Sequence, residues 1–246
     1  MHGFLRNTLT RYGVAGAASK FARPRAGLVF TSATLISVAL ATIAAPALAE
    51  TLRIAALGDS LTQGYGLAQG EGLVPQLEAW LRARGHDVTV LNAGVSGDTT
   101  AGGLSRLDWT LADEPDAMIV ALGGNDLLRG LDPAVSRANL AAILERLNAE
   151  GIPALLVGLP APGNYGPEFQ QAFDAMYPDL AGAHGALLLR DLLAPLTAAS
   201  ETGVPPGDLM QADMIHPNAA GVALVVEQLG PAVEALIERA RARDAS

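Results

Sequence analysis

Short apolar runs alternate with longer stretches of helical period through most of the chain. Each run is too short and too continuously apolar for a surface helix, which is typical of a strand buried on both faces of a sheet. The runs cover residues 52–57, 88–91, 117–122, 154–159 and 186–189. Between and after them, apolar positions recur with a helical period over residues 73–84, 100–112, 133–150, 167–184 and 218–241. From residue 50 onward, strand and helix therefore alternate.

This alternation predicts one α/β domain over residues 50–246, a three-layer α/β/α sandwich around a parallel sheet of about five strands. Parallel neighbours need a crossover connection, and a helical crossover packs back onto one face of the sheet. In such sheets, ligands gather at the carboxyl ends of the strands. Residues that directly follow the predicted strands are thus the candidates for a functional site.

Polar motifs occupy these positions. Gly-Asp-Ser-Leu (residues 58–61) follows the first run, Asn-Ala-Gly (residues 92–94) follows the second, and Gly-Gly-Asn-Asp (residues 123–126) follows the third. Asp-Met-Ile-His-Pro (residues 213–217) precedes the last predicted helix. We expect these four segments to meet at one rim of the sheet.

Ser60, His216 and Asp213 are the candidates for a catalytic triad. A serine hydroxyl is a poor nucleophile without a base, and an imidazole can take its proton and later return it to the leaving group. Asp213 lies three residues before His216, so in a tight turn its carboxylate can reach the ring nitrogen that faces away from Ser60. Asp208 is also near and stays open as an alternative acid.

An acyl-transfer enzyme also needs hydrogen-bond donors for the oxyanion of its tetrahedral intermediate. The candidates are the backbone N–H groups of Ser60 and Gly94 and the side-chain amide of Asn125. Gly94 could instead be a simple turn glycine, and Asn125 a helix cap. Asp59 and Asp126 are interpreted as loop residues that bond nearby backbone N–H groups, not as acids in the reaction.

The four motifs resemble those of SGNH, or GDSL, hydrolases. Residues 58–61, Gly94, residues 123–126 and residues 213–217 match the four family blocks in the family's order. The resemblance implies a flavodoxin-like α/β/α fold and a Ser60–His216–Asp213 triad. It also implies an oxyanion hole made by Ser60, Gly94 and Asn125.

Within this family, the chain resembles in particular the bacterial thioesterase I, lysophospholipase L1 and arylesterase group. The likeness runs over about residues 53–218 and includes Gly-Asn-Tyr-Gly (residues 163–166) and Leu-Met-Gln (residues 209–211). Members of the group are periplasmic or secreted, and they hydrolyse acyl thioesters, lysophospholipids and aryl esters. Met214 departs from relatives that have a glycine there, and a larger side chain at that point would narrow the acyl pocket.

The first 49 residues are typical of an export signal. Five basic residues precede an apolar run over residues 26–45, and Ala-Leu-Ala (residues 47–49) provides a cleavage site, so the mature chain is expected to begin at Glu50. An uncleaved membrane anchor is the alternative. No later segment has the pattern of a membrane span. The expected location is periplasmic or secreted.

Charge and composition narrow the possible partners. Without the leader, 11 basic residues remain against 25 acidic ones, a formal charge of −14, which argues against nucleic acid as a partner. The chain has no cysteine, which excludes disulfides and thiol nucleophiles. We find no clustered metal ligands, and the expected catalysis needs no cofactor. Nothing in the sequence requires more than a monomer.

The sequence therefore predicts a serine esterase that cleaves acyl esters or thioesters, as small-molecule substrates, through an acyl-serine intermediate. Lipid from a membrane is one possible source of substrate. Two alternatives stay open: a carbohydrate O-deacetylase with the same triad, and a non-catalytic binding protein on a flavodoxin-like scaffold.

Overall fold

The computed structural model describes residues 51–244, so the expected leader, residues 1–49, lies outside the described residues. The described chain forms one parallel sheet with the strand order β2-β1-β3-β4-β5. Its strands are β1 (Leu52–Gly58), β2 (Val88–Gly94), β3 (Ala117–Ala121), β4 (Ala154–Val157) and β5 (Leu187–Leu189). This order is that of flavodoxin-like sheets and confirms the expected fold class.

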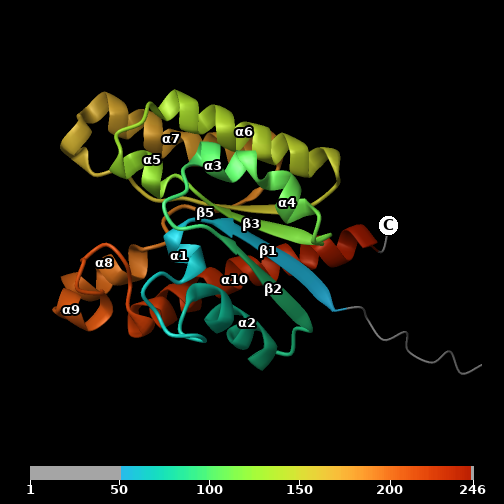
Figure 1. The fold of residues 1–246 in the computed structure, drawn as a ribbon, viewed down its shortest axis with the longest axis horizontal. Coiled ribbons are helices and arrows are strands. Elements are labelled where there is room, and N and C mark those ends of the chain that lie inside the picture. Colours follow the sequence, from blue (N-terminus) through green and yellow to red (C-terminus); the bar gives the residue numbers. More distant parts are fainter. Residues whose placement is uncertain (1–50, 245–246) are drawn as a thin grey trace, which may run out of the picture. The chain divides into compact units, whose positions relative to one another are not determined.

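Helices cover both faces of the sheet (Figure 1). On one face lie α2 (Leu73–Ala83), α8 (Ala194–Glu201), α9 (Pro206–Leu209) and α10 (Ala219–Asp244). On the other lie α3 (Thr100–Ser105), α4 (Leu107–Leu111), α5 (Gly124–Leu128), α6 (Pro133–Ala149) and α7 (Pro167–His184). Two further short helices are α1 (Ser60–Gln63), directly after β1, and the 3₁₀ turn η1 (Gly163–Tyr165). The result is three layers.

Each face of the sheet has its own hydrophobic core. Successive side chains of a strand point to opposite faces, and in β1 Ile54 and Ala56 join the core under α2 and α10, while Ala55 and Leu57 join the core under α6 and α7. The expectation of burial on both faces holds for β1, β3 and β4 but is wrong for the edge strands. Residues of β2 alternate between buried and partly exposed positions at first, and all three of β5 are partly exposed.

The helix expected over residues 100–112 is interrupted at Arg106, which separates α3 from α4. Its guanidinium donates one hydrogen bond to Asp98 Oδ2 (2.6 Å) and another to the carbonyl oxygen of Gly58 (2.8 Å). Arg106 thus joins the end of β1 to the loop that follows β2. These contacts join segments that are separate in the sequence, so the local period of apolar residues does not predict them.

Helix α10 is long and apolar enough to cross a membrane by length and composition, contrary to the expectation for the later segments. Half of that window is buried in the described structure, and Val225, Leu229 and Val233 belong to the core. We interpret α10 as a core helix. At its middle, the ring of Trp80 lies against Gly230, where an added Cβ would come within 2.5 Å of that ring. The Arg84 guanidinium lies 3.4 Å from the centroid of the same ring.

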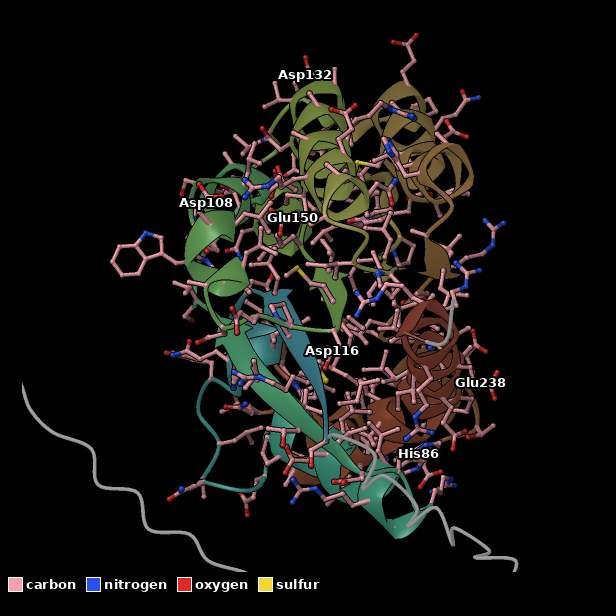
Figure 2. The ribbon with its side chains drawn as sticks, turned by 90° about the vertical axis from the view of Figure 1, so that its right-hand side faces the viewer. His86, Asp108, Asp116, Asp132, Glu150 and Glu238 are labelled. Atoms are coloured by element: carbon pink, nitrogen blue, oxygen red, sulfur yellow. The ribbon has the colours of Figure 1, made fainter. Side chains whose placement is uncertain are left out.

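Acidic side chains are spread over the outer helices. Figure 2 shows Asp108, Asp132 and Glu150 on the helices of the α6 face and Glu238 on α10, and all four are exposed. Arg146 contacts both Asp108 and Glu150 at 2.6 Å. Exposed pairs of this kind contribute little to the stability of a fold, because water and salt screen the two charges. These helices therefore present an acidic surface to solvent.

Candidate active site

Ser60 stands at the sharp corner between β1 and α1. The Asp59 carboxylate accepts a hydrogen bond from the N–H of Leu61 (3.0 Å) and so caps α1. Residue 58 must be glycine here, because an added Cβ would overlap the Thr62 side chain. The corner therefore presents the Ser60 hydroxyl at the carboxyl end of β1, an interior strand, and in Figure 1 α1, α5 and α8 lie at that end of the sheet.

Ser60, His216 and Asp213 form one continuous hydrogen-bonded chain. Ser60 Oγ lies 2.8 Å from His216 Nε2, and His216 Nδ1 lies 2.7 Å from Asp213 Oδ2. A carboxylate can only accept, so Nδ1 carries the proton and Nε2 is left to accept from the serine hydroxyl. Asp208, the alternative acid, lies instead in the first turn of α9 with an exposed side chain.

The Asp213 carboxylate is held in its charged form. Its hydrogen bond with the His216 side chain, together with the backbone N–H groups of His216 (3.0 Å) and Ile215 (2.9 Å), lowers its pKa to about 2. The same oxygen that accepts the two backbone bonds fixes the turn. The Asp213 carboxylate and the His216 ring are therefore held in place by three hydrogen bonds within residues 213–216.

Neighbouring side chains hold this loop in place. Gln211 donates from its amide to the carbonyl oxygens of Tyr65 (2.8 Å) and Pro217 (3.0 Å), and the Tyr65 ring lies 4.9 Å from the His216 ring. Met214 has a φ of +58°, a conformation that favours glycine, and its side chain is 54% exposed. Among the described residues of this loop, Ile215 lines the adjacent cleft and Met214 does not, so the expected narrowing by Met214 is not seen.

Two of the three expected oxyanion donors, the Ser60 N–H and the Asn125 side-chain amide, lie beside the Ser60 hydroxyl. Within residues 51–244, the backbone N–H of Ser60 has no hydrogen-bond partner. Asn125, in the first turn of α5, donates one amide hydrogen to Asp59 Oδ2 at 3.3 Å. Its second amide hydrogen remains for a ligand. Asp59 therefore orients the amide next to the nucleophile.

The geometry does not favour Gly94 as the third donor. Its N–H already donates to Asn92 Oδ1 (3.0 Å), and the residue is the last of β2, paired in register with Gly58. An added Cβ would lie 2.8 Å from Gln63 Cα and closer still to the backbone nitrogen of the same residue. Gly94 is a glycine because α1 packs against β2 at this point.

Gly97 was missed by the sequence analysis and fits the donor role better. Its N–H has no hydrogen-bond partner within the described chain, and its φ is +84°. The contacts on either side place it near the site: the N–H of Val95 binds the carbonyl oxygen of Gly58, and the N–H of Thr100 binds Asp126. A Ser-Gly-Asp stretch is a turn signal that could have singled out Gly97.

Two arginines hold the loop that contains Gly97. Arg129, at the end of α5, donates to the carbonyl oxygen of Gly97 (2.7 Å), and Arg106 binds Asp98. Because α5 also carries Asn125, one short helix positions both the amide and the Gly97 peptide.

Asp126 and Asp59 both have hydrogen-bond partners, as expected, but Asp126 lies in the first turn of α5 and not in a loop. Asp126 is buried and accepts hydrogen bonds from the Thr100 N–H (2.8 Å), the Thr100 hydroxyl (2.6 Å) and the Ser136 hydroxyl (2.8 Å). Burial raises the pKa of the Asp59 carboxyl above its usual value, although its hydrogen bonds with Leu61 and Asn125 oppose that shift. Both carboxylates fix loops around the site.

A cleft opens beside the hydrogen-bonded chain. It holds about 790 Å³ of empty volume, counting the space open to solvent, within the usual range for ligand sites. Half of the residues around it are apolar, among them Leu128, Leu159, Leu193 and Ile215, and the others include Ser60, Asn125 and Asp191. Leu128 and Ile215 are 62% and 49% exposed at its rim. The cleft can therefore take an apolar group next to the hydroxyl.

Comparison with known proteins places the chain among named hydrolases. Residues 56–224 match the GDSL-like Lipase/Acylhydrolase family. Esterase TesA of Pseudomonas aeruginosa is 39% identical over 201 residues, which cover 81% of this chain and 96% of that protein. Thioesterase 1/protease 1/lysophospholipase L1 of Escherichia coli K12 is 34% identical over 192 residues, 78% of this chain and 86% of the relative. The crystal structure of AlinE4, an SGNH-hydrolase family esterase, is 45% identical, with a TM-score of 0.62 over 76% of this chain and 97% of AlinE4.

Proposed function

The chain belongs to the GDSL-like lipase/acylhydrolase family and is a serine hydrolase of carboxylic esters, and we propose that Ser60, His216 and Asp213 carry out its reaction on acyl esters or thioesters. The observation that supports these roles is the continuous bonding from Ser60 Oγ through both ring nitrogens to Asp213. This is the arrangement of a nucleophile, its base and the group that orients the base.

In the first half of the reaction, Ser60 Oγ attacks the acyl carbon while His216 Nε2 accepts the hydroxyl proton. The carbonyl oxygen becomes negative and receives hydrogen bonds from the Ser60 N–H and the Asn125 amide. We propose the Gly97 N–H as the third donor in place of Gly94. Collapse of the intermediate breaks the bond to the alcohol or thiol, which leaves with the proton from His216, and the acyl group stays on Ser60.

In the second half, His216 takes a proton from water, and the resulting hydroxide attacks the acyl carbon. The intermediate expels Ser60 Oγ, which recovers its proton from His216, and the carboxylic acid leaves. The net reaction consumes one water and requires no group from outside the chain. Asp213 remains ionised and stabilises the imidazolium in both halves.

Replacing the nucleophile tests this proposal directly. Ser60→Ala is expected to lower the turnover of p-nitrophenyl butyrate by about 10⁶, while circular dichroism and the melting temperature Tm stay close to those of the wild type. A fluorophosphonate probe should label the wild type at Ser60 and leave the variant unlabelled. Retention of most activity by Ser60→Ala would show that another group is the nucleophile.

The names of the relatives favour an esterase or thioesterase over the non-catalytic binding protein. A carbohydrate O-deacetylase would share the mechanism but would bind a sugar in the cleft. The apolar lining supports an acyl chain there instead. Kinetics on p-nitrophenyl esters, acyl-CoA thioesters, lysophospholipids and acetylated xylan distinguish these substrates, since only a deacetylase would prefer xylan.

We also propose that the protein is exported and acts as a monomer. The basic and apolar pattern of residues 1–49 supports export. The proposed catalytic groups all lie within one chain, so the proposed reaction does not require a second copy. The intact mass of protein from the periplasmic fraction tests export, because a chain that still contains the leader would contradict cleavage after Ala49.

A further inference from the structure

The loop that follows β2 makes a tight turn with Gly97 at its apex. The N–H of Asp98 donates to the carbonyl oxygen of Val95 (3.1 Å), which closes a β-turn over residues 95–98. Gly97, the third residue of the turn, has a φ of +84°, and Ser96, the second, does not have a positive φ. This is the pattern of a type II turn, which favours glycine at its third position. The central peptide takes no part in the closing bond, so the Gly97 N–H is left to bind a ligand.

The apex of this turn is exposed and depends on its neighbours for support. The N–H of Val95 is bonded to the end of β1 (3.0 Å), and Asp98 is paired with Arg106 (2.6 Å). These contacts hold the two ends of the turn. Arg129 contacts the apex itself, because its Nη2 donates to the carbonyl oxygen of Gly97 at 2.7 Å. A hydrogen bond from a guanidinium is charge-assisted and about twice as strong as a neutral one.

The helix that carries Arg129 also supplies another oxyanion donor. Arg129 caps the C-terminal end of α5, and its N–H donates to the carbonyl oxygen of Asn125, one turn earlier (3.1 Å). Asn125 lines the cleft beside Ser60, whereas Arg129 does not line it. Helix α5 therefore holds the Asn125 amide directly and the Gly97 peptide through the guanidinium. The distance between these two donors is thus set by one helical turn and one side chain.

A motif from the sequence analysis supports that end of α5. In Gly-Asn-Tyr-Gly (residues 163–166), the Tyr165 hydroxyl donates to the carbonyl oxygen of Leu128 at 3.3 Å. The Tyr165 ring lies against Gly130, where an added Cβ would come within 2.9 Å of that ring. Gly130 also has a φ of +61°, which favours glycine. Tyr165 therefore holds the residues on both sides of Arg129.

We propose that Arg129 is a positioning residue of the oxyanion hole: its guanidinium holds the Gly97 N–H where the tetrahedral intermediate accepts from it and from the Asn125 amide together. The inference rests on the proposed function, because it requires Gly97 to be the third donor. The negative oxygen forms in both halves of the reaction and is absent from the bound substrate, so this stabilisation acts on the transition states. Loss of the guanidinium should therefore lower kcat and leave KM nearly unchanged.

Removing the guanidinium tests the proposal. Arg129→Ala is expected to lower kcat on p-nitrophenyl butyrate by about 10–100-fold, less than the loss of a whole donor, because the two ends of the turn stay tied. The inhibition constant of butylboronic acid, which forms a tetrahedral anion on Ser60, should rise by a similar factor. Arg137→Ala is the matched control, because Arg137 pairs with Asp179 (2.9 Å) on the outer helices and its loss should leave both constants unchanged.

Chemical rescue separates positioning from a general structural role. Guanidinium chloride, kept well below the concentrations that unfold the protein, should restore part of the kcat of Arg129→Ala, since the free ion can bind the Gly97 carbonyl oxygen. Potassium chloride at the same concentration should not restore it, because it only screens charges. Arg129→Lys should recover part of kcat, since an ammonium group donates a hydrogen bond but lacks the planar fork of arginine.

Two results would overturn the proposal. A wild-type kcat in Arg129→Ala would show that the Gly97 N–H needs no guanidinium. A lower kcat that is accompanied by a lower Tm, and that neither guanidinium nor Arg129→Lys restores, would show a merely structural role. Arg129→Met keeps the apolar stem and gives the same test if Arg129→Ala fails to fold. A wild type that neither hydrolyses p-nitrophenyl butyrate nor binds butylboronic acid would instead contradict the proposed function, so the two failures are distinguishable.

Discussion

The site combines two regions that are held in different ways. The nucleophile corner, residues 58–63, is packed between β1, β2 and the loops of β3, with Asp59 and Thr62 buried. The acid–base loop, residues 211–217, is largely exposed. Its Asp213 carboxylate accepts hydrogen bonds from the loop backbone, and its Gln211 amide donates to the carbonyl oxygens of Pro217 and Tyr65. Packing fixes where the serine lies, while local bonding fixes where the imidazole lies. Substitutions in the two regions should therefore impair the enzyme in different ways.

After loss of the nucleophile itself, the largest effect is expected in the acid–base loop. Asp213→Asn should lower kcat by about 10⁴, because an amide at this position favours the wrong tautomer of His216. Asp208→Asn is the control, since this exposed residue of α9 has no contact with the ring. Steady-state kinetics on p-nitrophenyl butyrate measure both. The opposite outcome, with Asp208→Asn inactive and Asp213→Asn active, would identify Asp208 as the acid.

A smaller loss is expected on the side of the oxyanion donors. Asn125→Ala should lower kcat by about 10²–10³ with little change in KM, the usual cost of one lost donor. Asn92→Ala is the comparison, because Asn92 accepts the Gly94 N–H in the present structure. If Gly94 takes no part in catalysis, Asn92→Ala should change kcat by only a few-fold. A rise in kcat of Asn92→Ala would instead support Gly94 as an oxyanion donor.

The smallest effect is a pH dependence of stability from Asp59. Its pKa is raised in the folded state above the ordinary value of 3.8, so the free energy of unfolding should fall as pH rises from 3.8 through the raised pKa. Asp59→Asn keeps an acceptor for Leu61 and removes the ionisation. Urea denaturation should thus show the variant gaining stability relative to the wild type between pH 4 and pH 7. A stability difference between the variant and the wild type that does not change with pH would contradict a raised pKa of the buried Asp59 carboxyl.

The spacing of apolar residues predicted all five strands and the long helices of the layers. Positions buried in a sheet or on one face of a helix are occupied by apolar residues, so their spacing can be seen in the sequence. The sequence also predicted that Ser60, His216 and Asp213 stand at the carboxyl edge. The short helices α8 and α9 were missed, since they are too brief to show a period. Gly97 was missed because the sequence does not show that Gly94 ends β2 in register with Gly58, which leaves the following loop to supply the donor.

The packing of Trp80 against Gly230 has a practical consequence. The chain has two tryptophans, and the other, Trp109, is 83% exposed on α4. Iodide should quench the emission of Trp109 readily and that of Trp80 poorly, since Trp80 is covered by α10 on one side and by Arg84 on the other. Iodide quenching thus separates the docking of α10 from events on the opposite face of the sheet.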